Sequence, residues 1–230
     1  MKQMQTEGLG DTVQERVEEF ADALKPRLRG WFHQGFTPVI LLAGLVLVAF
    51  GRTASIRFAS AIYLVSALLL FGNSAFYHRG NWTPKVKAVF RRVDHANIFV
   101  FIAGTYTPLS VAMLHGRSLV QILVLIWTCA LVGVLFRVFW IDAPRWLYVG
   151  LYVAMGWAAV GWMSQFLEAG GAAVVALIAA GGLVYTVGAL AYAFKYPNPW
   201  PEWFGFHEIF HICTIIAAIC HFIAICLVAF

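Results

Sequence analysis

Long apolar stretches without charged residues divide the chain into seven windows. They cover residues 30–51, 58–78, 95–116, 118–136, 146–167, 169–194 and 209–230. Each window is close to the ~20 residues that an α-helix needs to cross a ~30 Å hydrocarbon core. The windows are too long for transmembrane strands, and they do not alternate apolar with polar residues. The pattern therefore predicts an all-α membrane protein, a bundle of seven transmembrane helices joined by short loops.

Composition agrees with a membrane protein. Of the 230 residues, 61% are hydrophobic and 12% are charged, and the mean hydropathy is +0.78. A soluble domain of this size would have to expose large apolar patches, which soluble proteins rarely do. We therefore expect a multi-pass protein of the plasma membrane.

The positive charges predict an orientation. With the N-terminus in the cytosol, 13 of the 16 Lys and Arg residues fall on the cytosolic side, and the others are Arg52, Arg57 and Arg117. This bias follows the positive-inside rule, so we expect a cytosolic N-terminus and a C-terminus outside. The net charge of +5 then reflects cytosolic loops beside anionic lipids and does not indicate nucleic-acid binding.

The chain divides into a polar beginning and a membrane domain. Residues 1–29 lack the apolar core of a cleavable signal peptide, and Val13–Leu24 predicts a short amphipathic helix on the cytosolic face that ends before Pro26. Residues 30–230 form the predicted membrane domain.

The four cysteines all lie in apolar windows without CxxC spacing, so we expect small buried side chains and no disulfide framework.

Ionisable and polar side chains gather at the cytosolic ends of three predicted helices. The second window ends with Ser74 and His78, the third begins beside Asp94, and the seventh begins beside His207 and His211. Such groups are costly inside a membrane and usually mark function. Because His207 and His211 are four residues apart, they lie on one helix face about 6 Å apart and can reach one ion.

His207, Glu208 and His211 spell H-E-x-x-H, the motif of zinc metalloproteases in which the Glu is the base. No acidic residue follows His211, and His221 lies about 15 Å further along the helix, too far to share a metal. A third ligand must therefore come from upstream, where His78 is best placed. Three histidines with an open fourth position are typical of catalytic zinc.

Each candidate also has a purely structural interpretation. The three histidines could be polar packing groups at helix ends, and Asp94 could be a helix N-cap instead of holding or deprotonating a water at the metal. Ser74 could simply bond across helices or to its own backbone. Asp94, Asn97 and Thr105 share a helix face that should look inward. We expect His221 to make an interhelical hydrogen bond, with substrate contact as its alternative.

Other polar and aromatic residues are interpreted as structural. We expect no metal or substrate role for His33, His95 and His115. The run NPWPEWF before the seventh window is typical of an interfacial belt, and we interpret Arg137 and Trp140 in the same way.

Four stretches carry a resemblance to a known family: NSAFYH, DHANIFVFIAGTYTP, RWLYVGLYVAMGW and YPNPWPEWFGFHEIFHICTIIAAICHF. Over roughly residues 30–230 the chain resembles the hemolysin III family, bacterial relatives of the progestin and adipoQ receptors and more distantly of the alkaline ceramidases. The resemblance implies a zinc ion near the cytosolic face, held by His78, His207 and His211. It also implies that Asp94 contacts the metal through water with Ser74 nearby, and we take these two as the catalytic residues.

The chain departs from the family pattern at two places. Family members often carry Glu-x-x-Asn-x-x-x-His before the first helix, whereas LRGWFHQG keeps His33 and lacks the Glu and the Asn. Ala96 stands where a Ser is common. The family also accepts Gln in place of Glu208, so Glu208 is not expected to be an obligatory base.

The resemblance and the polar cluster together predict a zinc-dependent hydrolase of a lipid amide or ester, with membrane lipids as partners and a role in membrane lipid homeostasis. One alternative is a sensor or regulator of membrane lipids in which zinc is structural and joins two helices. A second is a pore-forming cytolysin, although the sequence lacks a secretion signal. A third is an intramembrane protease, which would need a carboxylate-bearing partner motif such as N-P-D-G. The oligomeric state stays open.

Overall fold

A computed structural model describes residues 26–140 and 143–230 of the chain. The amphipathic helix predicted at Val13–Leu24 lies outside these residues. The described elements are α2 (Trp31–Phe50), α3 (Ala54–Arg79), α4 (Pro84–Met113), α5 (Gly116–Phe139), α6 (Arg145–Gly156), the 3₁₀ helix η1 (Trp157–Trp162), α7 (Met163–Phe194) and α8 (Phe206–Ala229). The described ranges contain no β-strand beyond one isolated bridge, so the predicted all-α class is confirmed.

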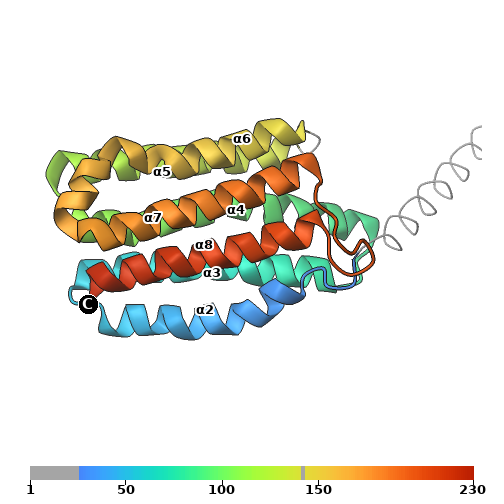
Figure 1. Cartoon of the computed structure of the whole chain (residues 1–230), viewed down its shortest axis with the longest axis horizontal. Helices are drawn as coiled ribbons and strands as arrows, with labels where there is room; N and C mark the ends of the chain where they lie inside the picture. The colour runs from blue at the N-terminus through green and yellow to red at the C-terminus, as the bar shows by residue number, and fades with distance from the viewer. Residues whose placement is uncertain (1–25, 141–142) are drawn as a thin grey trace, which may run out of the picture.

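Six stretches of the described chain are long and apolar enough to cross a membrane. One of them, Arg145–Phe194, has 50 residues and covers the two predicted windows 146–167 and 169–194. Within it Gly171 leaves helical geometry, with φ of 77° and ψ of 175°. Figure 1 shows that the chain turns back in this region, so that α6 and α7 lie side by side. The chain is therefore a multi-pass membrane protein.

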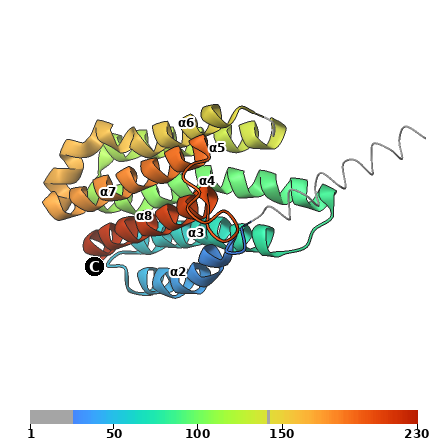
Figure 2. The same ribbon diagram turned by 45° about the vertical axis from the view of Figure 1, so that its right-hand side comes forward.

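The helices lie roughly along one direction in both ribbon views. α5 and α6 lie on one side of the bundle, α2 lies on the other, and α3, α4, α7 and α8 lie between them (Figures 1 and 2). α8 packs against α7, α4 and α2. The C-terminus lies at one end of the bundle, and residues 26–30 lie at the opposite end with the start of α8.

Helix α4 begins earlier than the apolar window predicts. Pro84 occupies its first turn, where the missing N–H of proline costs nothing, and the charged residues that follow continue the helix. Asp94 therefore lies well inside α4, and the interpretation of Asp94 as an N-cap is wrong. The apolar window 95–116 does not include the start of α4, because that start contains charged residues. Such residues form helices readily outside a membrane.

The outer surface of the bundle is apolar, and inside it some helices approach each other closely. α5 exposes Val120, Val124 and Leu131, each between 59% and 61%, as expected of side chains that face lipid. At the contact of α3 and α4, a Cβ on Gly104 would lie 2.0 Å from Ser66 Oγ, so the small residue permits the close approach. The described cysteines are all free, but none is fully buried: Cys129 is exposed and the three on α8 are partly exposed. The predicted burial is therefore wrong, because an apolar window includes the helix faces that contact lipid as well as those that face the bundle.

Candidate metal centre

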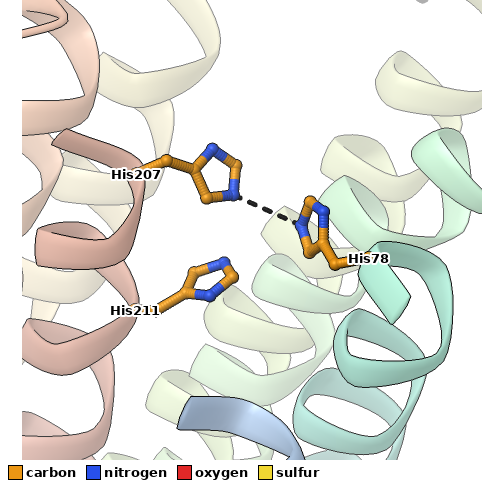
Figure 3. A group of neighbouring side chains, drawn as sticks. All are labelled: His78, His207 and His211. Atoms are coloured by element: carbon orange, nitrogen blue, oxygen red, sulfur yellow. Dashed lines mark hydrogen bonds between the residues drawn. The ribbon is translucent and has the colours of Figure 1, made fainter. Parts of the chain in front are cut away.

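Three histidines from two helices converge at the end of the bundle where residues 26–30 lie. His78 lies in the last turn of α3, and His207 and His211 lie in the first turns of α8. Each offers a ring nitrogen, and these three atoms lie within 4.8 Å of one another. The Nε2 atoms of His78 and His207 are 3.3 Å apart (Figure 3). The structure thus brings together the three predicted ligands, and this cluster could hold a metal ion.

The chain before α2 packs directly against this cluster. Gly30 has a φ of 83°, a conformation that favours glycine, and a Cβ there would lie 2.7 Å from the Cβ of His78. Backbone N–H groups of Arg27 and Leu28 donate to the carbonyls of Glu202 and Trp203, at 2.9 and 3.2 Å. Residues 26–30 therefore connect the end of α3 with the loop before α8.

Asp94 and Ser74 lie beside the histidines, as predicted. Asp94 Oδ2 is 3.9 Å from His78 Nε2, and a side-chain hydrogen bond joins Asp94 to Ser74. Both side chains are buried. Asn97 donates a hydrogen bond of 2.7 Å to a backbone carbonyl of α3. Since Asp94, Asn97 and Thr105 are all buried, the prediction that this face of α4 looks inward is confirmed.

The carboxylate of Glu208 forms a hydrogen bond and an ion pair that stabilise the fold. Its Oε2 accepts a hydrogen bond of 2.9 Å from the N–H of Gly205, the residue that caps α8, and its Oε1 forms an ion pair with Arg29. The Glu208 side chain is fully buried. Both carboxylate oxygens therefore serve to fix the first turn of α8.

The contact of His33 with the histidine cluster was not predicted from the sequence. The ring of His33 stacks on the ring of His211, with centroids 3.8 Å apart and planes 15° apart. Neither ring nitrogen of His33 has a partner within the described part of the chain. The signal available in the sequence was its position in the first turn of α2, at the same end of the bundle as His207.

Arg137 also differs from its predicted place. Its side chain is 1% exposed, and its NH2 lies 2.6 Å from Nδ1 of His95. The guanidinium lies over the ring of Tyr148, 4.4 Å from the centroid. The interpretation of Arg137 as an interfacial belt residue is therefore wrong, because a cation–π contact and a histidine nitrogen accommodate its charge inside the bundle.

A largely apolar cavity extends from the histidine cluster into the bundle. Asp94, His207 and His211 line one part of it, and Tyr185 and His221 line another. The remaining walls are mostly aliphatic and aromatic side chains of α4, α6, α7 and α8. The candidate metal centre thus borders a largely apolar space inside the bundle.

His221 takes the role that its position in α8 predicts. Its Nε2 lies 3.1 Å from the backbone carbonyl oxygen of Ile178 on α7, so the predicted interhelical hydrogen bond is confirmed.

Comparisons with known proteins agree with these features. Residues 21–222 match the family model described as haemolysin-III related. The chain is 27% identical over 205 residues to Hemolysin-3 of Bacillus cereus, a match that covers 87% of this chain and 90% of that protein. It is 34% identical over 134 residues to a Hemolysin-3 homolog of Bacillus subtilis (strain 168), covering 58% of this chain and 62% of the relative. It is 27% identical over 192 residues to an adiponectin receptor protein of Drosophila melanogaster, covering 70% of this chain and 40% of that protein.

The family match extends over most of the chain, from before α2 to near the end of α8, and it includes every residue of the histidine cluster. The chain therefore belongs to the haemolysin-III-related family.

Proposed function

We propose that this protein is a zinc-dependent hydrolase of a membrane lipid amide or ester, with a role in membrane lipid homeostasis. The observation that carries the proposal is the position of three convergent histidines and Asp94 at one end of an apolar cavity. A polar reaction centre and an apolar chamber in one bundle suit a substrate that has a polar head and a long apolar chain.

The donor set fits zinc. Zn–N bonds of about 2.0–2.1 Å in tetrahedral geometry place neighbouring nitrogens about 3.3–3.4 Å apart. The Nε2 atoms of His78 and His207 are 3.3 Å apart. Nδ1 of His211 is buried and has no hydrogen-bond partner within the described residues, and buried polar atoms are nearly always paired. Three imidazoles also leave a fourth position open, as catalytic zinc sites do.

The residues around the cluster can perform the proton transfers of hydrolysis. A bound zinc ion would supply Lewis acidity toward a carbonyl oxygen and toward water. Asp94 then accepts the proton of the attacking water and returns it to the leaving amine or alcohol. Ser74, hydrogen-bonded to Asp94, keeps the carboxylate turned toward the cluster. The apolar cavity holds the acyl chain and excludes bulk water from the reaction.

The hydrolase is tested by measuring zinc content and the hydrolysis of ceramide-like amides by the purified protein. Asp94→Asn should keep the zinc and lower turnover about 10²–10⁴-fold, the usual contribution of a general base. The exposed Glu168 lies away from the cavity lining and offers a matched control, because Glu168→Gln removes a carboxylate without touching the cluster. Full turnover in Asp94→Asn, or a purified protein without zinc, would exclude the proposal.

A regulator with structural zinc is the second candidate. It is favoured by the origin of the ligands, since His78 comes from α3 and the other two from α8, so one ion would join two helices. The same assays separate the two functions. Bound zinc without turnover of any lipid amide or ester, together with a lipid phenotype in Asp94→Asn cells, would support the regulator.

We further propose seven membrane crossings with the N-terminus in the cytosol. The proposal counts the stretch Arg145–Phe194 as two crossings, because it turns back near Gly171. Residues 26–30 and the C-terminus lie at opposite ends of the bundle, as an odd number of crossings requires (Figure 1). A reporter that is active only outside the cytoplasm should be active when fused after Phe230 and inactive when fused before α2.

A further inference from the structure

We propose that Tyr185 and His221 form a second polar subsite in the cavity, which binds a hydroxyl group in the middle of a lipid chain. The inference rests on the proposed function only for the lipid nature of the ligand. It concerns recognition of the chain and requires no chemical step.

The hydrogen bond at Nε2 of His221 determines whether Nδ1 donates or accepts. Nε2 lies 3.1 Å from the carbonyl oxygen of Ile178. Because a carbonyl only accepts, Nε2 carries the proton and donates, which leaves Nδ1 of the neutral ring as an acceptor. Nδ1 is buried and has no partner within the described part of the chain. A molecule bound in the cavity can therefore supply the donor that this nitrogen lacks.

The backbone of α7 holds the His221 ring in this position. A Cβ on Gly181 would lie 2.4 Å from Nε2, so the ring occupies space that any larger residue would fill. Gly181 thus allows the imidazole to reach the Ile178 carbonyl.

Tyr185 supplies the second group. It lies one turn after Gly181 on α7, and its ring centroid is 5.6 Å from that of His221. The Tyr185 hydroxyl is also buried and without a partner among the described residues. Both side chains line the cavity that contains His207 and His211. Two unpaired polar side chains from neighbouring helices thus line the same part of a largely apolar cavity.

The chemistry of the pair selects a hydroxyl group. Nδ1 of His221 requires a donor, and the Tyr185 hydroxyl can donate to an oxygen. One alcohol group satisfies both, because its hydrogen points to Nδ1 and its oxygen accepts from Tyr185. A carboxylate cannot donate, an ammonium group cannot accept, and a methylene group does neither.

The distance along α8 places this hydroxyl within the chain of the lipid. His221 follows His211 by ten residues, which corresponds to about 15 Å at 1.5 Å per residue. If the carbonyl of the lipid lies at the histidine cluster, the group bound by the subsite belongs to the middle of the acyl chain. The structure therefore favours a lipid with a hydroxylated chain.

The test compares the binding of ricinoleic acid with that of oleic acid, which lacks the mid-chain hydroxyl. Both compete with a fluorescent fatty acid for the purified protein, with zinc bound and after chelation. The wild type should bind ricinoleic acid about ten-fold more tightly, the effect of leaving buried polar groups unpaired in the oleic acid complex. Tyr185→Phe keeps the ring and should reduce the preference to about two-fold or less, as should His221→Phe.

Thr214→Val is the matched control on α8. Thr214 also lines the cavity, but its hydroxyl already donates to the Phe210 carbonyl at 2.8 Å, so the variant should keep the preference. Equal binding of the two acids by the wild type, or a preference that survives both Tyr185→Phe and His221→Phe, overturns the subsite and indicates that water alone fills it. Binding of neither acid also overturns it. A retained preference without any hydrolysis contradicts the proposed hydrolase and supports the subsite.

Discussion

The ion pair between Arg29 and Glu208 connects the chain before α2 with the first turn of α8, and its removal should be costly. The side chain of Glu208 is 0% exposed and that of Arg29 is 16% exposed. Breaking a buried pair by removing one partner leaves an uncompensated charge and costs about 3–5 kcal/mol. In Arg29→Met, Glu208 keeps the hydrogen bond from Gly205, so we expect the lower limit of about 3 kcal/mol.

A thermal-unfolding cycle measures this effect. For proteins of this size 1 kcal/mol changes Tm by about 2–4 °C, so Arg29→Met should lower Tm by about 6–12 °C in a fixed detergent. In the double variant Arg29→Met/Glu208→Gln no charge is left behind, and the glutamine oxygen can still accept from Gly205. The double variant should therefore lose only about 1 kcal/mol and be more stable than Arg29→Met.

Two results would refute this reasoning. If the effects of Arg29→Met and Glu208→Gln simply add in the double variant, the two side chains are not coupled. If Glu208→Gln keeps its zinc and its melting temperature but loses all hydrolysis, Glu208 is a chemical base and the H-E-x-x-H protease interpretation applies. We expect Glu208→Gln to retain turnover, because both carboxylate oxygens contact Arg29 and Gly205.

Three further predictions concern the metal and the packing. His78→Ala should reduce the zinc content from about one ion per chain to nearly none, as measured by elemental analysis, because two histidines make an incomplete site. Chelation should lower Tm in the wild type, since a ligand at 100 times its Kd stabilises by about 2.7 kcal/mol, and should leave the Tm of His78→Ala unchanged. Gly104→Ala should destabilise the protein, because its Cβ would lie 2.0 Å from Ser66 Oγ, and Ser66→Gly should restore part of the lost Tm. An unchanged melting temperature in Gly104→Ala would mean that α3 and α4 can separate freely.

The sequence predicted the helix positions well because charge is costly in lipid. Each uncharged window lies on a helix, or on one arm of the stretch Arg145–Phe194. The start of α4 was predicted too late, since the charged residues after Pro84 lie where hydrophobicity gives no signal. Apolar windows report the part of a helix that faces lipid, and local propensity and proline decide where it begins.

The histidine cluster was also predictable, because depth and rotation along a helix can be calculated from sequence position alone. Alternating direction through the membrane places the end of one helix and the start of another at the same level. His78 and His207 meet for this reason. The confirmed inward face of Asp94, Asn97 and Thr105 follows from the helical period.

The surroundings of the cluster could not be predicted in the same way, because they depend on which elements are neighbours. His33 stacks on His211 and Arg29 pairs with Glu208 because the chain before α2 crosses the end of the bundle. The left-handed turn at Gly30 brings this segment against His78, and nothing in the hydrophobic pattern indicates such a turn. The positions of the three histidines follow from helical geometry, whereas the groups around them follow from a tertiary contact. This contact assigns Glu208 to the cap of α8 and leaves Asp94 as the carboxylate nearest the histidine cluster that has no such partner.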